Sequence, residues 1–353
     1  MTPLADRLAK LIRQNGPLTV ADYMRHCLLD PDYGYYTTRN PFGTDGDFIT
    51  APEISQMFGE LIGLALAQTW LDQGAPNPCA LVELGPGRGT LMADILRATK
   101  SVPDFPDAVE VHLVEASPTL RAIQNETLST RVHHHETVAT LPDAPILLVA
   151  NEFFDALPVR QYMRDGSGWR ERVIGLVDGV LAFGLADVSH PPALDPRLSD
   201  TTDGDLVEIC PSAAAIARDI DARIAQRGGV AYFIDYGDWR SLGDTLQAVS
   251  AHTSEPPLER PGLADLTTHV DFEALSNAAT ATKASRLCPQ GVFLERLGIT
   301  DRARALARNL AGAALDQHVA AHRRLTHPDE MGTLFKVMTL SPIDAPIPPG
   351  MTT

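Results

Sequence analysis

The chain has 353 residues, of which 44% are hydrophobic and 21% charged, and its formal net charge is −16. This length and composition indicate a folded globular protein with a substantial core and room for two or three domains. The acidic excess disfavours nonspecific nucleic-acid binding, which depends on Lys and Arg neutralising phosphates, and makes a basic protein segment the more natural partner.

Targeting and membrane signals are not evident. No apolar run approaches the roughly 20 residues of a membrane-spanning helix, so we expect no stable membrane insertion. The opening segment MTPLADRLAK has no apolar signal core and already carries Asp6. We therefore expect a bacterial, cytoplasmic protein. Cys27, Cys79, Cys210 and Cys288 form no C-x-x-C pair, which predicts reduced thiols rather than a disulfide framework or zinc site.

The first 75 residues predict a helical region with a lid. Helices are expected at 3–14, 19–29 and 53–73, with proline near two of their starts. Segment 33–50 mixes aromatic residues with glycines, so we predict a lid that folds over a bound ligand. The alternative interpretation is a packed surface loop without a role in binding. From residue 76 to 353 we expect an α/β core.

The core opens with a glycine-rich turn, LVELGPGRGT at 81–90. A short apolar strand precedes it and a helix follows. Gly85, Gly87 and Gly89 can adopt positive φ and let a ligand approach the backbone, and the helix start presents unpaired N–H groups. The dinucleotide pattern G-x-G-x-x-G would need glycine where this chain has Thr90, so a nicotinamide dehydrogenase fits imperfectly.

Two carboxylates are further candidates for contacts to the ligand of this turn. Glu83 lies just before it, and Glu115 ends a second apolar strand at 109–117, 30 residues after Gly85. A carboxylate at that position can accept hydrogen bonds from both ribose hydroxyls. Glu115 therefore supports nucleoside binding without choosing the cofactor, and a surface carboxylate in a turn is the alternative.

A third apolar run, at 146–150, leads into further polar residues. Ligands of open parallel sheets lie beyond the carboxyl ends of the strands, so side chains leaving this strand should face the reaction site. Asn151, Glu152 and Asp155 are the candidates, although each alone is also an ordinary turn former.

The remainder of the chain predicts an insertion and a return to the core. Antiparallel hairpins at 158–186 form an insertion at about 156–205, and a core strand at 229–236 brings Asp235 and Tyr236 to the active edge. The other expected elements are a Pro-rich loop at 189–204, a helix at 211–226, a strand at 246–250, helices near 272–282 and 301–324, and a strand at 334–340.

Histidines do not predict a metal site. His133, His134 and His135 are consecutive, and neighbours on a strand point to opposite faces, so they cannot readily chelate one ion. His318 and His322 have helical spacing but lack the glutamate of H-E-x-x-H. An exposed helix face is the better interpretation.

Several long blocks carry a family resemblance. They are DPDYGYYTTRNPFGTDGDFITAPEISQMFGELIG at 30–63, LVELGPGRGTLMADILR at 81–97, HLVEASPTLR at 112–121, ANEFFDALPVRQ at 150–161, YFIDYG at 232–237, GDTLQAVSAH at 243–252 and MGTLFKVM at 331–338. Across nearly the whole chain they resemble the mitochondrial complex I assembly-factor family of protein arginine methyltransferases and its bacterial relatives.

The resemblance implies a Rossmann-like α/β fold and the cofactor S-adenosyl-L-methionine. It further implies symmetric dimethylation of arginine on a respiratory complex I (NADH-quinone oxidoreductase) subunit, with Gly46, Asp47 and Thr50 as cofactor-side contacts. The substrate arginine, the degree of methylation and the oligomeric state stay open. A noncatalytic assembly scaffold that binds the cofactor and, more remotely, an NAD-dependent dehydrogenase are the alternatives.

Arginine methylation poses a specific chemical problem. The guanidinium is protonated at neutral pH, and a cation is a poor nucleophile. A pair of carboxylates can hold it bidentately and point one nitrogen at the methyl group. Glu152 is the first choice, with Asp155, Glu208 or Asp235 as its partner. Methyl transfer needs alignment of two bound reactants and no enzyme nucleophile.

Overall fold

A central β-sheet organises the structure, a computed structural model that describes residues 2–38, 50–250 and 253–352. Its strand order is β15-β17-β10-β5-β2-β3-β4, with β14 beside β10 and β16 beside β17. The strands are β2 (Cys79–Leu84), β3 (Val109–Val114), β4 (Val132–His135), β5 (Ile146–Asn151), β10 (Gly229–Asp238), β14 (Val270–Asp271), β15 (Lys283–Ala284), β16 (Cys288–Pro289) and β17 (Phe335–Ser341).

Strands β4, β3, β2, β5 and β10 run parallel, and β17 is antiparallel to β10. Every residue of β2 and β5 is buried, as expected for apolar strands covered on both faces. The strands predicted at these positions and the α/β fold class are confirmed. The carboxyl ends of the parallel strands meet at one edge, where ligands bind in such sheets.

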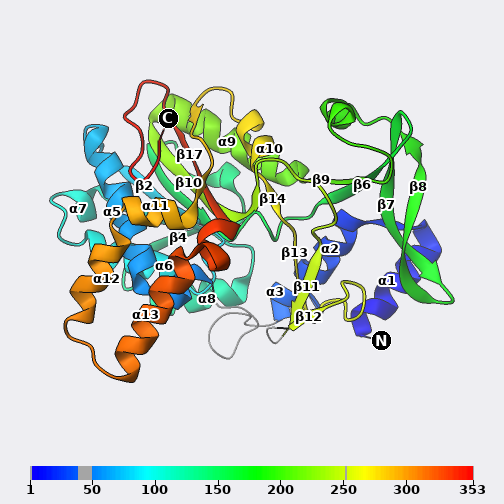
Figure 1. Cartoon of the computed structure of the whole chain (residues 1–353), viewed down its shortest axis with the longest axis horizontal. Helices are drawn as coiled ribbons and strands as arrows, with labels where there is room; N and C mark the ends of the chain where they lie inside the picture. The colour runs from blue at the N-terminus through cyan, green and yellow to red at the C-terminus, as the bar shows by residue number, and fades with distance from the viewer. Residues whose placement is uncertain (1, 39–49, 251–252, 353) are drawn as a thin grey trace.

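Helices cover both faces of this sheet (Figure 1). On one face, Phe58 and Trp70 pack with Leu81; on the other, Ile220 and Phe272 pack in the cluster that contains Val82. The helices are α1 (Pro3–Asn15), α2 (Val20–Leu29), α3 (Tyr35–Thr38), α4 (Ala51–Ile54), α5 (Gln56–Asp72), α6 (Thr90–Thr99), α7 (Phe105–Ala108), α8 (Pro118–Thr127), α9 (Pro211–Arg227), α10 (Phe272–Ala278), α11 (Gln290–Arg296), α12 (Ile299–Ala307) and α13 (Ala313–Thr326), with shorter helical turns η1 (Val138–Thr140), η2 (Pro192–Ser199) and η3 (Pro328–Gly332).

Two smaller sheets lie beside α1 and α2. The predicted hairpins form a five-stranded sheet of β1 (Leu18–Thr19), β6 (Arg160–Asp165), β7 (Gly168–Val177), β8 (Val180–Ser189) and β9 (Leu206–Ile209), and a three-stranded sheet contains β11 (Gln247–Ser250), β12 (Thr253–Glu255) and β13 (Asp265–Thr267). Leu8 and Met24 share one hydrophobic cluster with Ile174 and Leu266. The N-terminal helices are therefore packed jointly on the insertion and the small sheet.

Three predicted elements differ in detail. The helix expected at 53–73 is two helices, because extended Ser55 interrupts it and caps α5 by accepting a hydrogen bond from the N–H of Met57. The helix expected at 301–324 is interrupted before Ala313, where Gly312 has a positive φ of 55°. The loop expected at 189–204 contains the 3₁₀ helix η2.

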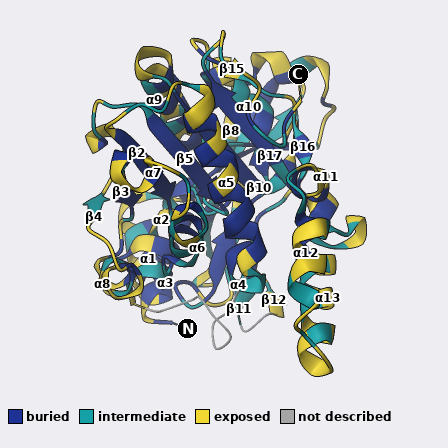
Figure 2. Ribbon diagram, turned by 90° about the vertical axis from the view of Figure 1, so that its left-hand side faces the viewer, coloured by how far each residue is buried: buried dark blue, intermediate teal, exposed yellow. Residues whose placement is uncertain are grey.

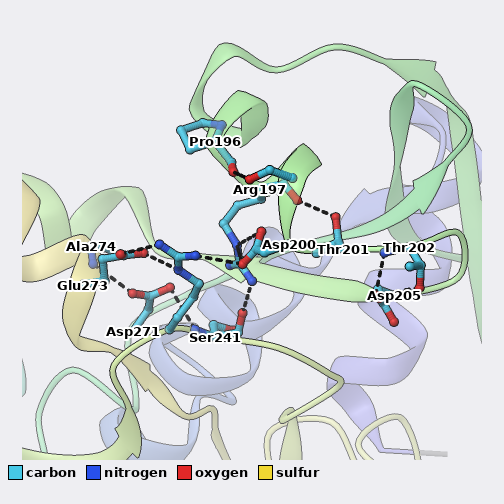
Figure 3. Close-up of polar contacts among 12 residues, drawn as sticks. Pro196, Arg197, Asp200, Thr201, Thr202, Asp205, Ser241, Asp271, Glu273 and Ala274 are labelled. Atoms are coloured by element: carbon cyan, nitrogen blue, oxygen red, sulfur yellow. Dashed lines mark hydrogen bonds and ion pairs between the residues drawn. The ribbon is translucent and has the colours of Figure 1, made fainter.

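An ion-pair network fixes that loop to the core (Figure 3). Arg197 binds the carboxylate of Asp200 at 3.1 Å and donates to the carbonyl oxygen of Ser241 at 2.7 Å. Arg240 binds Asp200 at 3.0 Å and Glu273, at the start of α10, at 2.6 Å. The insertion is thus connected to the central sheet by charged contacts as well as by apolar packing.

Burial follows the layers (Figure 2): the central strands are buried, while α12 and α13 carry exposed surface. Within the described ranges, none of the helices has the length and apolar character needed to cross a bilayer.

Candidate functional site

Two adjoining cavities lie at the carboxyl edge of the central sheet. The first, here called the acidic cavity, is lined by Tyr36, Thr50, Pro52, Glu53, Glu83, Gly85, Pro86, Gly87, Arg88, Thr90, Leu91, Asn151, Glu152, Asp155, Tyr236, Asp265 and Thr267. The second, here called the apolar cavity, is lined by Leu28, Leu29, Tyr36, Gly85, Gly87, Val114, Glu115, Ala116, Ser117, Leu120, Glu152, Phe153, Ala156, Leu157 and Pro158. Four residues line both, so the two cavities adjoin across the glycine turn.

The glycine turn has the backbone that the sequence predicted. Gly85, Gly87 and Gly89 have φ values of 61°, 51° and 85°. A Cβ atom at Gly85 would lie 2.8 Å from the ring of Phe153, so glycine is needed there for space as well as for conformation. The Nε2 of Gln124 donates to the carbonyl oxygen of Gly87 at 2.7 Å and holds the turn against α8.

Glu115 stands at the end of β3, beside the apolar cavity. Its Oε1 accepts a hydrogen bond from the backbone N–H of Ser117 at 2.8 Å, and Gln124 contacts Oε2 at 3.4 Å. Burial raises the pKa of this carboxyl. The side chain is thereby oriented along the wall of a cavity whose other side chains are mostly apolar.

The acidic cavity contains buried acceptor atoms without partners. Among the described residues, Glu83 Oε2, Asn151 Oδ1 and Asp155 Oδ1 are buried and receive no hydrogen bond. Buried polar atoms are normally satisfied, so unpartnered acceptors on a cavity wall indicate a ligand that donates hydrogen bonds. Burial raises the pKa of Glu83 to about 8 and that of Asp155 to about 6.

Glu152 is held in a strained conformation between the two cavities. Its φ is 50°, which is uncommon for a residue with a side chain and costs on the order of 1–3 kcal/mol. Its Oε1 accepts hydrogen bonds from the N–H of Ala51 at 2.9 Å and from Asn151 Nδ2 at 3.1 Å. Burial raises the pKa of Glu152 to about 7. Strain of this kind persists where the surrounding structure enforces it, often at functional sites.

Asp235 lies behind this loop rather than in either cavity. Its Oδ2 accepts hydrogen bonds from the backbone N–H groups of Phe153, Phe154 and Asp155 at 3.2, 2.9 and 3.3 Å, and its side chain is fully buried. Burial and the neighbouring negative charges of Asp155 and Glu152 raise its pKa, while hydrogen bonds from the backbone N–H groups of Tyr236 and Asp155 oppose the shift. Asp235 therefore positions the loop that carries Glu152 and Asp155.

Glu208 lies elsewhere and lines neither cavity. It is on β9, in the five-stranded sheet, where it accepts hydrogen bonds from Gln161 Nε2 at 2.7 Å and from the N–H and hydroxyl of Thr245. Its buried charge is satisfied by structural contacts. Of the candidate lid contacts, Thr50 lines the acidic cavity; Gly46 and Asp47 lie outside the described residues.

Three charged residues that line the acidic cavity were missed from the sequence. Glu53 comes from α4 and accepts a hydrogen bond from the Thr90 hydroxyl at 2.9 Å. Asp265 comes from β13 and accepts from the Tyr36 hydroxyl at 2.9 Å. Arg88 lies inside the glycine turn and could have been noticed there. Nothing local marks Glu53 or Asp265, because tertiary packing brings their segments to the edge of the sheet.

The buried carboxyl of Glu83 should make the ligand-free protein less stable as pH rises. Between its usual pKa near 4.5 and its raised pKa of about 8, the folded state holds a proton that the unfolded state releases. The free energy of unfolding therefore falls with increasing pH across this window. Glu83→Gln should flatten this dependence between pH 5 and 8, measured by thermal melting.

The matched control is Glu136→Gln, because Glu136 is exposed. It should reproduce the wild-type pH dependence, and some dependence should persist in Glu83→Gln because Glu152 and Asp155 shift in the same direction. A Glu83→Gln curve parallel to that of the wild type would contradict the assignment.

Comparisons with known proteins agree with this geometry. The family model for the S-adenosyl-L-methionine-dependent methyltransferase matches residues 61–290. "Protein arginine methyltransferase NDUFAF7, mitochondrial" is 36% identical in Mus musculus, over 97% of this chain and 85% of the relative, and 35% identical in Homo sapiens, over 97% and 84%. A solved structure from Burkholderia thailandensis, bound to S-adenosyl-homocysteine, is 30% identical with a TM-score of 0.83 and covers 96% of this chain and 91% of that chain.

The predicted localisation is contradicted by these relatives. The sequence predicted a bacterial, cytoplasmic protein, whereas the curated relatives from Danio rerio and Homo sapiens are mitochondrial. The prediction rested on the opening segment, which in the structure forms α1 and buries Leu4, Leu8 and Ile12. Its composition reflects packing in the folded protein, so it was a poor guide to the compartment.

Proposed function

The chain belongs to the family of S-adenosyl-L-methionine-dependent methyltransferases, and from this premise we propose that it methylates an arginine side chain of a protein substrate. The observation that carries the proposal is the pair Glu152 and Asp155 on the wall of the acidic cavity, with Asp155 Oδ1 buried and unpartnered. Two carboxylates on one cavity wall suit a planar cation with several N–H donors.

The residues present fit the cofactor. The apolar cavity, with Leu120 and Phe153 on its wall, suits an adenine ring, and Glu115 beside it suits ribose hydroxyls. The unpartnered acceptors Glu83 Oε2 and Asn151 Oδ1 suit an ammonium group. When bound there, S-adenosylmethionine supplies a methyl group on a positively charged sulfur. By resemblance, Thr50 and the lid residues Gly46 and Asp47 join these contacts in the proposal.

The carboxylates then act on the substrate. A guanidinium entering between Glu152 and Asp155 favours their ionised forms, because an opposite charge lowers a carboxyl pKa. Their hydrogen bonds fix its plane and draw positive charge away from the nitrogen that is methylated. That nitrogen must lose a proton as it gains the methyl group, and Glu152, with a pKa of about 7, can accept it. Asp235 keeps both groups in place through its backbone contacts.

The proposed substrate is a subunit of respiratory complex I, and the proposed product is symmetric dimethylarginine. Both follow from the family resemblance. The relatives named as protein arginine methyltransferases support arginine as the acceptor, and the net charge of −16 favours a basic substrate segment. A scaffold that binds the cofactor without catalysis is the competing hypothesis.

Paired peptides test the acceptor. One peptide has arginine as its target residue and the other has lysine at the same position, both with free termini blocked. Incubation with S-adenosylmethionine should place methyl groups on arginine alone, located by tandem mass spectrometry. Methylation of lysine would overturn the arginine proposal; methylation of neither, with cofactor bound and a complex I fraction also unmodified, would favour the scaffold.

A further inference from the structure

Arg88 lines the acidic cavity and forms no ion pair with the carboxylates of the described residues there. It is the one cationic side chain among the described residues lining the acidic cavity, whose five carboxylates are Glu53, Glu83, Glu152, Asp155 and Asp265. In the described part of the chain, no carboxylate forms an ion pair with it. The nearby Arg97 and Arg302, in contrast, both bind Glu60, at 2.7 and 2.8 Å. A half-buried guanidinium that has five N–H donors and no carboxylate partner is suited to bind an anionic group that enters the cavity.

The backbone around Arg88 favours the same charge. Arg88 lies between Gly87 and Gly89 and immediately precedes the ten-residue helix α6. Gly89 is the N-cap and offers no side-chain hydrogen bond, so the first N–H groups of the helix lack a side-chain partner. Such a helix start attracts negative groups.

The same cavity also provides the complementary group. Glu83 is 3% exposed, and its Oε2 is an unpartnered acceptor. An acceptor at Glu83 and donors at Arg88 together match a ligand that carries an ammonium and a carboxylate on one carbon. This is the chemistry of an α-amino acid group.

We propose that Arg88 binds the carboxylate of the methionine end of S-adenosylmethionine and so selects the cofactor by that end. The inference rests on the methyltransferase assignment but does not depend on arginine being the methyl acceptor. Without its carboxylate, the cofactor would be a stronger cation, attracted by the acidic wall and repelled by Arg88. Arg88 should therefore strengthen the binding of S-adenosylmethionine and weaken the binding of decarboxylated S-adenosylmethionine.

Calorimetry with two ligands tests this. Wild-type protein is titrated with S-adenosylmethionine and with decarboxylated S-adenosylmethionine, and the titrations are repeated with Arg88→Met and Arg88→Lys. Because Arg88→Met loses a charged hydrogen bond, its affinity for S-adenosylmethionine should be about 10- to 100-fold lower than that of the wild type. Decarboxylated S-adenosylmethionine should bind this variant as tightly as the wild type, or more tightly. Arg88→Lys should be intermediate, since it keeps the charge without the planar pair of donors.

Arg131→Met, at an exposed position, should change neither affinity. Equal weakening of both ligands in Arg88→Met or in a folded Arg88→Lys would overturn the inference, because it would show a general effect on the cavity. Unchanged affinity for S-adenosylmethionine would overturn it as well. Absence of S-adenosylmethionine binding to the wild type is a different result, and would refute the proposed function itself.

Discussion

Glu152→Gln is expected to abolish methyl transfer while leaving the protein folded. Glutamine keeps a side-chain oxygen that can accept the hydrogen bond from the Ala51 N–H, which is 2.9 Å long in the wild type. Glutamine also has the same side-chain length as glutamate, so it adds no new steric strain at the φ of 50°, and the local structure should survive. It removes the negative charge that holds the guanidinium and the base that takes its proton. We expect kcat to fall roughly 10²- to 10³-fold, a loss typical of removing one electrostatic contact to the reacting group.

The measurement is the initial rate of peptide methylation at saturating S-adenosylmethionine, with melting temperature and cofactor affinity recorded in parallel. Glu136→Gln, on the exposed surface, is the matched control and should keep the wild-type rate. A Glu152→Gln protein that methylates arginine at the wild-type rate would remove Glu152 from the mechanism. A rate lost together with the fold would instead indicate structural damage, and Glu152→Asp would then be needed to separate charge from shape.

Gly87→Val is expected to prevent cofactor binding. Gly87 has a φ of 51°, which a β-branched residue strongly disfavours, and it lines both cavities. Its carbonyl also anchors the turn to Gln124. A valine side chain would strain the turn and occupy space beside the ligand, so we expect the affinity for S-adenosylmethionine to fall at least about 100-fold.

Gly166→Val provides the control for backbone strain. Gly166 has a similar φ of 57°, but it lies in the turn between β6 and β7, where an added Cβ meets nothing within 4 Å. It should lower the melting temperature and leave the calorimetric affinity unchanged. If folded Gly87→Val binds S-adenosylmethionine as the wild type does, the glycine turn is not the cofactor site.

The parallel core and the glycine turn could be predicted because their signals are local. Continuous apolar runs specify β2 and β5, and three alternating glycines specify positive φ in the turn that follows β2. The residues leaving β5, including Glu152 and Asp155, were found for the same reason: strand ends in a parallel sheet share one edge. Their roles as ligands of a guanidinium stay predictions.

Site residues whose position depends on packing between distant segments were harder to predict from the sequence. Glu208 resembles Glu152 in the sequence, since both are at or next to the end of a strand, but its strand β9 belongs to the five-stranded sheet. Asp265 lies on β13, a three-residue strand with no sequence signal for a site, and reaches the acidic cavity through the packing of the small sheet. The division at residue 75 likewise stays a prediction.

Calorimetric titration of the wild-type protein with S-adenosylmethionine, beside S-adenosylhomocysteine and NADH, tests the central claim most directly. The account predicts one binding site for the two sulfur ligands, with mutual competition and micromolar affinity, and no heat from NADH. Binding of NADH with no response to S-adenosylmethionine would contradict the assignment of both cavities.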